Sequence, residues 1–474
     1  MVFILLLVPS TPSLAQPADA FSYVITVDED GDAEVSIAIN AKLLRGMGIG
    51  ETWLAVPRGE RIVWSFTDGR PSYVVSPLYV APGEINMFYN NITISTLGYD
   101  TISLRYSFKM ASLIVDDRAL FLSPLIVIDN RLSGKLVIHI KNVAKVNEYG
   151  VQPQQFSKAK DSVTVVFNLP LSSGRVWIDY NLEKPLGFDE IVIDGFRGVV
   201  PEKYSAYMRH ILMLYSDLSR NMTELFKVMP ENITVRFFLP RTFYEGVDGY
   251  VPILPSGLGD ININIFTIRM LPGIMEHVAV HELIHHYLWS AGIDNDLLWF
   301  HEGAANFFSI YFLNKIGLRG VKAVEDSLLN VSQNLPYPAG FIVGWSRSSP
   351  THNPTLYYAS SYLVFHTLYK KHGLNLFEGF FAYLNENNVR IRETQDVVSI
   401  FSILSGGATD NTFRRLGLFA DDSTLARDFR DSQFLLFLVF SLAVLLIISV
   451  SALTKLRRPN ETYVESGDFP SYVG

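Results

Sequence analysis

Apolar and polar residues alternate in short runs along the first part of the chain, between about residues 21 and 185. The clearest runs are 23–27, 35–39, 136–140, 163–167 and 176–180. Because successive side chains of a strand point to opposite faces, this alternation indicates strands with one buried face. The pattern predicts an all-β region of one or two sandwich-like modules over residues 21–188.

The period of the pattern changes after residue 189. Apolar residues recur at helical spacing over 202–228, strand-like runs follow at 233–239 and 261–268, and helical segments alone come after them. This order predicts an α+β domain over residues 189–425 that becomes all-helical towards its end.

A long apolar run lies near the C-terminus. Residues 434–453 contain no charged side chain and are almost all Leu, Val, Phe, Ile or Ala, and Lys455, Arg457 and Arg458 follow them. Twenty apolar residues match one helical crossing of a bilayer, and basic residues favour the cytoplasmic side. We expect a transmembrane helix at 434–453 and a cytoplasmic tail at 454–474. A buried core helix is the alternative.

The first residues resemble a secretory signal peptide. A short apolar run, Val2–Val8, precedes a stretch with small residues, and residues 1–20 are therefore predicted to be a signal peptide. A buried first strand is the alternative. Together with the C-terminal run, this segment predicts a single-pass cell-membrane protein with the bulk of the chain outside. Asn-x-Ser/Thr triplets in that part are compatible with glycosylation.

Composition excludes several classes of function. A formal net charge of -8 and a pI near 5.7 argue against a nucleic-acid binder, because phosphate contact needs a basic surface. The absence of cysteine excludes disulfides, thiolate metal sites and a cysteine nucleophile. Any metal ion must therefore be held by His, Asp or Glu side chains.

One motif carries a recognisable chemistry. His281-Glu282-Leu283-Ile284-His285 is an HExxH pattern inside a predicted helix, between Pro272 and Gly292. Residues four apart share a helix face, so both imidazoles can bind one cation while Glu282 reaches a water on that cation. The other histidines nearby, His277, His286, His301 and His366, are interpreted as packing or supporting residues.

Catalytic zinc takes three protein ligands and keeps one position open. A second predicted helix, capped by residues 294–296 and running to about residue 317, carries Glu302 near its start. A short loop makes the two helices antiparallel neighbours, which brings Glu302 towards His281 and His285. The sequence predicts one Zn²⁺ ion bound by these three side chains.

These residues resemble the zinc signature of the aminopeptidase N family of gluzincins, HExxH followed by W-L-x-E-G-x-A. The matching residues are His281, Glu282, His285, Trp299, Glu302, Gly303 and Ala305. The family leaves roughly eighteen residues between the second His and the Glu, whereas this chain leaves sixteen, so its connecting loop is shorter. The resemblance implies a thermolysin-like catalytic domain.

Two further roles follow from the resemblance. The stretch from Tyr357 to Leu368 is similar to the family's tyrosine helix, which implies that Tyr358 donates a hydrogen bond to the oxyanion of the reaction; Tyr357 is the nearest substitute. The family's exopeptidase motif has no clean copy. Asp260, just before a predicted strand, stands where that motif's substrate-binding Glu would be.

The function expected from these observations is a zinc metallopeptidase that hydrolyses peptide or protein substrates, with Glu282 as the base and Tyr358 as the second catalytic residue. Whether it is an aminopeptidase or an endopeptidase stays open. The alternative is a surface binding or adhesion protein that keeps the gluzincin fold without catalysis. The sequence does not predict the oligomeric state.

Overall fold

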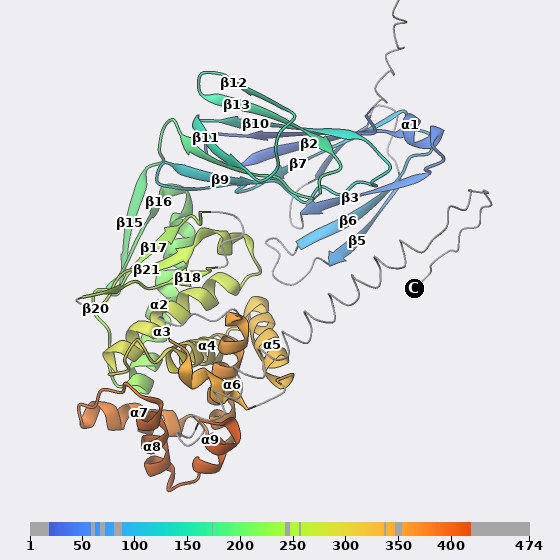
Figure 1. The fold of residues 1–474 in the computed structure, drawn as a ribbon. Coiled ribbons are helices and arrows are strands. Elements are labelled where there is room, and N and C mark those ends of the chain that lie inside the picture. Colours follow the sequence, from blue (N-terminus) through green and yellow to red (C-terminus); the bar gives the residue numbers. More distant parts are fainter. Residues whose placement is uncertain are drawn as a thin grey trace, which may run out of the picture.

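The computed structural model describes residues 19–418, apart from 58–61, 67–71, 80–87, 173, 242–246, 256, 336–337 and 347–352. Within them, strands dominate the first half of the chain and helices the second (Figure 1). The predicted N-terminal β region is therefore present, and so is the change to helices after it.

Three sheets lie in the described residues of the β region. The largest has seven strands, in the spatial order β12 (Gln155–Lys158), β13 (Ser162–Leu169), β10 (Gly134–Lys141), β1 (Phe21–Val27), β2 (Ala33–Asn40), β7 (Thr101–Phe108) and β4 (Ile62–Phe66). A four-stranded sheet is ordered β11 (Val143–Tyr149), β14 (Trp177–Leu182), β9 (Arg118–Leu122) and β8 (Ser112–Val115). The third is ordered β3 (Glu51–Pro57), β6 (Phe88–Ser95) and β5 (Tyr73–Tyr79), and a short helix, α1 (Ala41–Gly46), follows β2.

The alternation read from the sequence matches the burial of these strands. In β2, Ala33, Val35, Ile37 and Ile39 are buried while the residues between them are not. The buried faces of the large sheet and of the sheet containing β9 and β14 meet in one hydrophobic core. This packing is the sandwich that the pattern predicts.

The second part of the chain begins with a mixed sheet and continues with helices. Its five-stranded sheet has the order β15 (Phe188–Ile193), β16 (Phe196–Pro201), β17 (Thr234–Phe238), β21 (Ile261–Asn264) and β18 (Gly249–Tyr250). A two-stranded hairpin, β19 (Ile253–Leu254) and β20 (Gly257–Leu258), lies between β18 and β21 in the chain. The helices are η1 (Glu202–Tyr204), α2 (Ser205–Phe226), η2 (Ile265–Arg269), α3 (Ile274–Ser290), α4 (Leu298–Asn314), α5 (Arg319–Gln333), η3 (Ala339–Gly344), α6 (Pro354–His372), α7 (Asn375–Glu386), α8 (Thr394–Ser405) and α9 (Asp410–Leu416).

The strand expected over 261–268 ends earlier than its sequence pattern indicates. The side chain of Asn264 accepts a hydrogen bond from the backbone N–H of Phe266 at 3.0 Å, and its own backbone carbonyl accepts one from the Thr267 hydroxyl at 2.8 Å. These bonds turn the chain into the 3-10 helix η2 directly after β21. Asn264 therefore sets the point where the sheet gives way to the helical part.

Close packing between α4 and α6 fixes the helical layer. A Cβ atom on Gly303 would lie 2.7 Å from the backbone oxygen of Ser361 and 2.9 Å from the ring of Phe365, so only glycine fits there. Aromatic rings fill the space around this crossing, with Phe300 and Phe365 5.0 Å apart between ring centroids. Glu302 and Tyr358, on these two helices, are held in a fixed relation by this contact.

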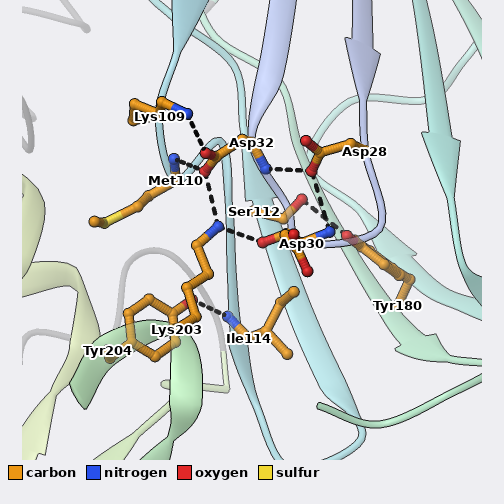
Figure 2. Close-up of polar contacts among 10 residues, drawn as sticks. All are labelled: Asp28, Asp30, Asp32, Lys109, Met110, Ser112, Ile114, Tyr180, Lys203 and Tyr204. Carbon is orange, nitrogen blue, oxygen red and sulfur yellow. Dashed lines mark hydrogen bonds and ion pairs between the residues drawn. The ribbon is translucent and has the colours of Figure 1, made fainter. Parts of the chain in front are cut away.

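Polar contacts join the β region to the helical part (Figure 2). The ammonium of Lys203 lies 2.8 Å from Oδ1 of Asp32 and donates to the backbone oxygen of Asp30. The Tyr204 hydroxyl accepts the backbone N–H of Ile114 at 2.9 Å. Lys109 binds the other oxygen of Asp32 at 2.7 Å. The acidic turn between β1 and β2, residues 28–32, therefore contacts η1, directly before the start of α2.

The predictions that concern a membrane are corrected by the structure. Across the described residues, no helix combines the length and the apolar character needed to cross a bilayer. The longest, α2, has 22 residues but carries charged side chains along its length, among them Arg209, Asp217 and Arg220. The described helices therefore give no support to the predicted transmembrane helix of the fold class or to the predicted cell-membrane location. Residues 434–453, the signal peptide and the tail lie outside the described residues.

Candidate metal centre

Helix α3 presents the HExxH motif. It starts after Gly273, whose φ of 107° suits glycine, and the Glu276 carboxylate accepts the Gly273 backbone N–H at 2.9 Å, which caps the helix. The helix ends at Ser290, shortly before Gly292, as the sequence indicates. His281 and His285 therefore lie one above the other on one helix face, with ring centroids 4.9 Å apart.

Helix α4 brings the third predicted ligand. Oε2 of Glu302 lies 3.2 Å from Nε2 of His281 and 3.8 Å from Nε2 of His285. One ligand atom from each of the three side chains lies within 4.8 Å of the other two, which is a spacing that a single metal ion can bridge. The structure therefore brings His281, His285 and Glu302 together.

The start of α4 differs from the predicted one. The helix begins at Leu298, after Leu297, and no side chain caps it. Asp294 instead accepts the backbone N–H of Asp296 at 3.1 Å, within the loop. The loop is also pinned by the backbone bond from Asp294 to the oxygen of Ile391 at 2.9 Å. The Asp294 side chain and the backbone bond to Ile391, and not a side-chain cap on α4 itself, hold the loop that orients Glu302.

The pKa shifts of two of the three side chains, Glu302 and His285, suit a cation. Burial would raise the pKa of Glu302, but the imidazoles of His285 and His281 outweigh it and hold the pKa at about 2. Burial lowers the pKa of His285 well below its ordinary value. For His281, burial lowers the pKa, but Glu302, together with Glu282 and Asn306, raises it by more. The pKa of His281 therefore lies above its ordinary value. An anionic carboxylate beside a neutral imidazole is a ligand set ready for a divalent metal.

Both imidazoles have supporting contacts behind them. Nδ1 of His285 lies 3.3 Å from Nδ1 of His301, and Nε2 of His301 lies 3.4 Å from the backbone oxygen of Ile293. The side chain of Asn306 hydrogen-bonds His281 and donates to the backbone oxygen of Glu302 at 2.9 Å. Such partners fix the tautomer and orientation of a ligand imidazole. The sequence analysis interpreted His301 as a packing or supporting residue, and its contact with His285 is of the supporting kind.

Glu282 lies in the same pocket. The pocket has a volume of about 260 Å³, and its lining includes His281, Glu282, His285, His301 and Glu302. Burial raises the pKa of Glu282 to about 8, against the lowering effect of His281. A buried carboxyl group with this raised pKa can both accept and return a proton near neutral pH.

Helix α6 contributes Tyr358 to this pocket, and its ring packs against Trp345 with centroids 5.2 Å apart. Tyr357 points elsewhere: its ring contacts Phe341 at 4.9 Å and Trp345 at 5.3 Å. Of the two tyrosines, only Tyr358 is among the described residues that line the pocket. The structure therefore brings the predicted tyrosine, and not its substitute, to the cluster.

Asp260 takes a different position. Its carboxylate pairs with Nε of Arg236 at 2.8 Å, its side chain is 42% exposed, and it is not among the described residues that line the pocket. Strand β18, which pairs antiparallel with β21, lines the pocket instead through Gly249 and Tyr250. Sequence reasoning missed this strand because a two-residue strand leaves no alternating pattern.

Comparisons with known proteins give structural neighbours of the same family as the motif resemblance. No family model matches the chain, and no curated protein matches its sequence. An aminopeptidase N family protein from Idiomarina loihiensis is similar at 12% identity and a TM-score of 0.36, over 84% of this chain and 75% of that one. An M1 zinc metallopeptidase from Deinococcus radiodurans is similar at 14% identity and a TM-score of 0.33, over 84% and 92%. At such TM-scores the functional assignment rests on the side chains of the pocket.

Proposed function

We propose that this protein is a zinc-dependent metallopeptidase. The observation that carries the proposal is the convergence of His281, His285 and Glu302, with Glu282 in the same pocket. Two imidazoles and one carboxylate are a ligand set of catalytic zinc in hydrolases, and one ion satisfies all three. The fit is supported by the anionic state of Glu302 and the neutral state of His285.

Zinc held by these side chains would supply a Lewis acid and would lower the pKa of a water molecule beside it towards roughly 7. Glu282 is the proton carrier in the proposed reaction. It takes the proton from the attacking water and returns it to the amine that leaves when the peptide bond breaks. Its burial keeps bulk water from competing for that proton.

Tyr358 has the role of an oxyanion donor in this proposal. As attack on the carbonyl carbon builds negative charge on the carbonyl oxygen, the phenolic O–H donates a hydrogen bond to that oxygen. Its support is the position of Tyr358 in the same pocket as Glu282. Packing of Tyr358 against Trp345 limits the orientations that the ring can adopt.

The test uses the purified protein, its metal content and a panel of peptides with free and blocked amino termini. Glu282→Gln is expected to keep zinc and to lose peptide hydrolysis, whereas Glu302→Ala is expected to lose both. Cleavage of blocked peptides would identify an endopeptidase, and cleavage of free ones alone an aminopeptidase. Full hydrolysis by Glu282→Gln would refute the assignment of Glu282 as the base. A wild-type protein that binds zinc without cleaving any peptide would refute the proposed peptidase activity.

A further inference from the structure

A buried amide group lies in the pocket without a hydrogen-bond partner. Asn295, in the loop between α3 and α4, is 7% exposed and lines the same pocket as the three proposed metal ligands. Within the described part of the chain, its side-chain nitrogen Nδ2 is buried and has no partner. Such an N–H group has lost its hydration and gained nothing in return, so it destabilises the folded protein. A ligand that carries an acceptor into the pocket would remove this cost.

The loop around Asn295 is held by backbone hydrogen bonds on both sides of it. The N–H of Asp294 donates to the oxygen of Ile391 at 2.9 Å, and the N–H of Ile391 donates to the oxygen of Gly292 at 2.8 Å. The N–H of Leu297 donates to the oxygen of Asp294 at 3.0 Å. A side chain on a loop fixed in this way loses little conformational entropy when it binds a ligand.

The lining of the pocket indicates which acceptor suits Asn295. Among the described lining residues, Asn295 is the single amide, and none is Lys or Arg. Away from the proposed metal site, this lining therefore offers no cationic side chain that could hold an anionic group. A neutral acceptor suits the amide better, and a polypeptide carries one on every residue, its backbone carbonyl oxygen.

We propose that Asn295 is a substrate-binding residue, whose side-chain N–H donates a hydrogen bond to a backbone carbonyl oxygen beside the bond that is cleaved. This inference rests on the proposed peptidase function and adds a specificity-determining contact to it. The carbonyl oxygen of the cleaved bond belongs to Tyr358 in that proposal, so Asn295 takes a neighbouring one. A pocket of about 260 Å³ is small, which keeps this second carbonyl close to the first. Asn295 therefore favours polypeptides over substrates with a single carbonyl group, such as amino acid anilides.

The first test separates substrate binding from stability. Asn295→Leu keeps the approximate size of the side chain and removes its polar atoms, so the melting temperature is expected to stay the same or rise. Peptide affinity, measured in zinc-loaded Glu282→Gln protein with the panel peptide that the wild type cleaves fastest, is expected to fall about tenfold. The matched control is Asn91→Leu on β6: Oδ1 of Asn91 is also buried without a partner in the described part of the chain, and Asn91 does not line the pocket.

A second measurement identifies the acceptor. In a set of peptides, each backbone carbonyl within two residues of the cleaved bond, other than that of the bond itself, is replaced in turn by a thiocarbonyl, which is a weaker acceptor. One replacement is expected to weaken binding to the Glu282→Gln parent about threefold or more. The same replacement should have no effect once Asn295→Leu is added, because the two changes remove the same hydrogen bond.

Equal peptide affinity with and without Asn295→Leu would overturn the inference, and so would an identical response of both proteins to every thiocarbonyl peptide. Weaker binding together with a lower melting temperature and lower zinc affinity, and with the thiocarbonyl effects unchanged, would also overturn it, because Asn295 would then only support the loop. Failure of the proposed function has a different signature: the wild-type protein cleaves no peptide of the panel, and the inference then fails with it.

Discussion

Gly249 of strand β18 lies directly against the side chain of Glu282. A Cβ atom at position 249 would lie 2.8 Å from Oε1 and 3.0 Å from Cγ of Glu282, and 2.7 Å from a methyl group of Val278. These distances are shorter than van der Waals contact, so the strand can approach the proposed base only because residue 249 has no side chain. The absent side chain thus helps to set the position of the proposed base.

Gly249→Ala is expected to lower kcat about tenfold to a hundredfold, because a displacement of the base by a fraction of an ångström misaligns proton transfer. Zinc content should change little, and the melting temperature is expected to fall because the added methyl group overlaps buried Val278. Gly50→Ala, where the added methyl group meets no atom within 4 Å, is the control. Wild-type kcat in Gly249→Ala would show that the strand does not position Glu282.

The zinc dependence of stability provides a measurement that does not need catalysis. An ion that binds only the folded chain stabilises it by about 2.7 kcal/mol at a free concentration one hundred times its Kd. Chelation should therefore lower the melting temperature, and added zinc should restore it. His281→Ala should show no zinc-dependent shift. A melting temperature that does not respond to zinc in the wild-type protein would argue against the metal centre.

Tyr358→Phe tests the oxyanion donor. Removing one hydroxyl that bonds the developing oxyanion costs about a hundredfold in kcat in comparable sites. KM and zinc content are expected to stay near wild-type values, because the hydroxyl acts only as charge develops. Tyr357→Phe changes the adjacent ring, which packs against Phe341 and Trp345, and should keep its activity. Equal losses in both variants would indicate a packing effect.

His301 contacts the proposed ligand His285, and its removal should act through the metal. His301→Ala leaves Nδ1 of His285 without the ring that lies 3.3 Å away. Loss of such a partner weakens metal affinity about tenfold to a hundredfold. Competition with a fluorescent zinc chelator measures this change directly. His366→Ala, on α6, is the control, and unchanged affinity in His301→Ala would show that the contact does not orient His285.

The ligand cluster could be predicted because local rules determine it. The four-residue spacing of His281 and His285 fixes their common face on any helix, and a short loop places Glu302 on the neighbouring helix. The strand pattern of the β region was readable for a similar reason: alternation along each strand decides which face is buried. These features depend on residues close together in the sequence.

The remaining features depend on tertiary contacts. Strand β18 exists because Gly249 and Tyr250 pair with Ile263 and Asn262, and nothing in its own two residues indicates a strand. Asp260 was predicted to bind substrate because of its position along the chain, just before a strand. In the structure its carboxylate forms an ion pair with Arg236. The contact between Asp32 and Lys203 joins residues 171 positions apart in the sequence, so no local pattern predicts it.

That contact carries a prediction about pH. Burial would raise the pKa of Asp32, but the ammonium groups of Lys109 and Lys203 and the backbone N–H of Met110 lower it to about 2, from an ordinary value of 3.8. A carboxyl group whose pKa is depressed by folding stabilises the native state above its unfolded pKa, and this contribution is lost as pH falls through the folded pKa. The Asp32 side chain is 22% exposed, so solvent screens the pair only in part.

Asp32→Asn is therefore expected to lower the free energy of unfolding by about 2 kcal/mol at neutral pH, and the difference from wild type should shrink as pH falls from about 4 towards 2. Urea unfolding at several pH values measures this difference. Asp129→Asn is the matched control: the hydrogen bonds from Arg131 also lower the pKa of Asp129 to about 2, but this pair lies in solvent and should contribute little. A difference between Asp32→Asn and wild type that does not vary with pH would show that the carboxylate's charge is not what joins the first hairpin to α2.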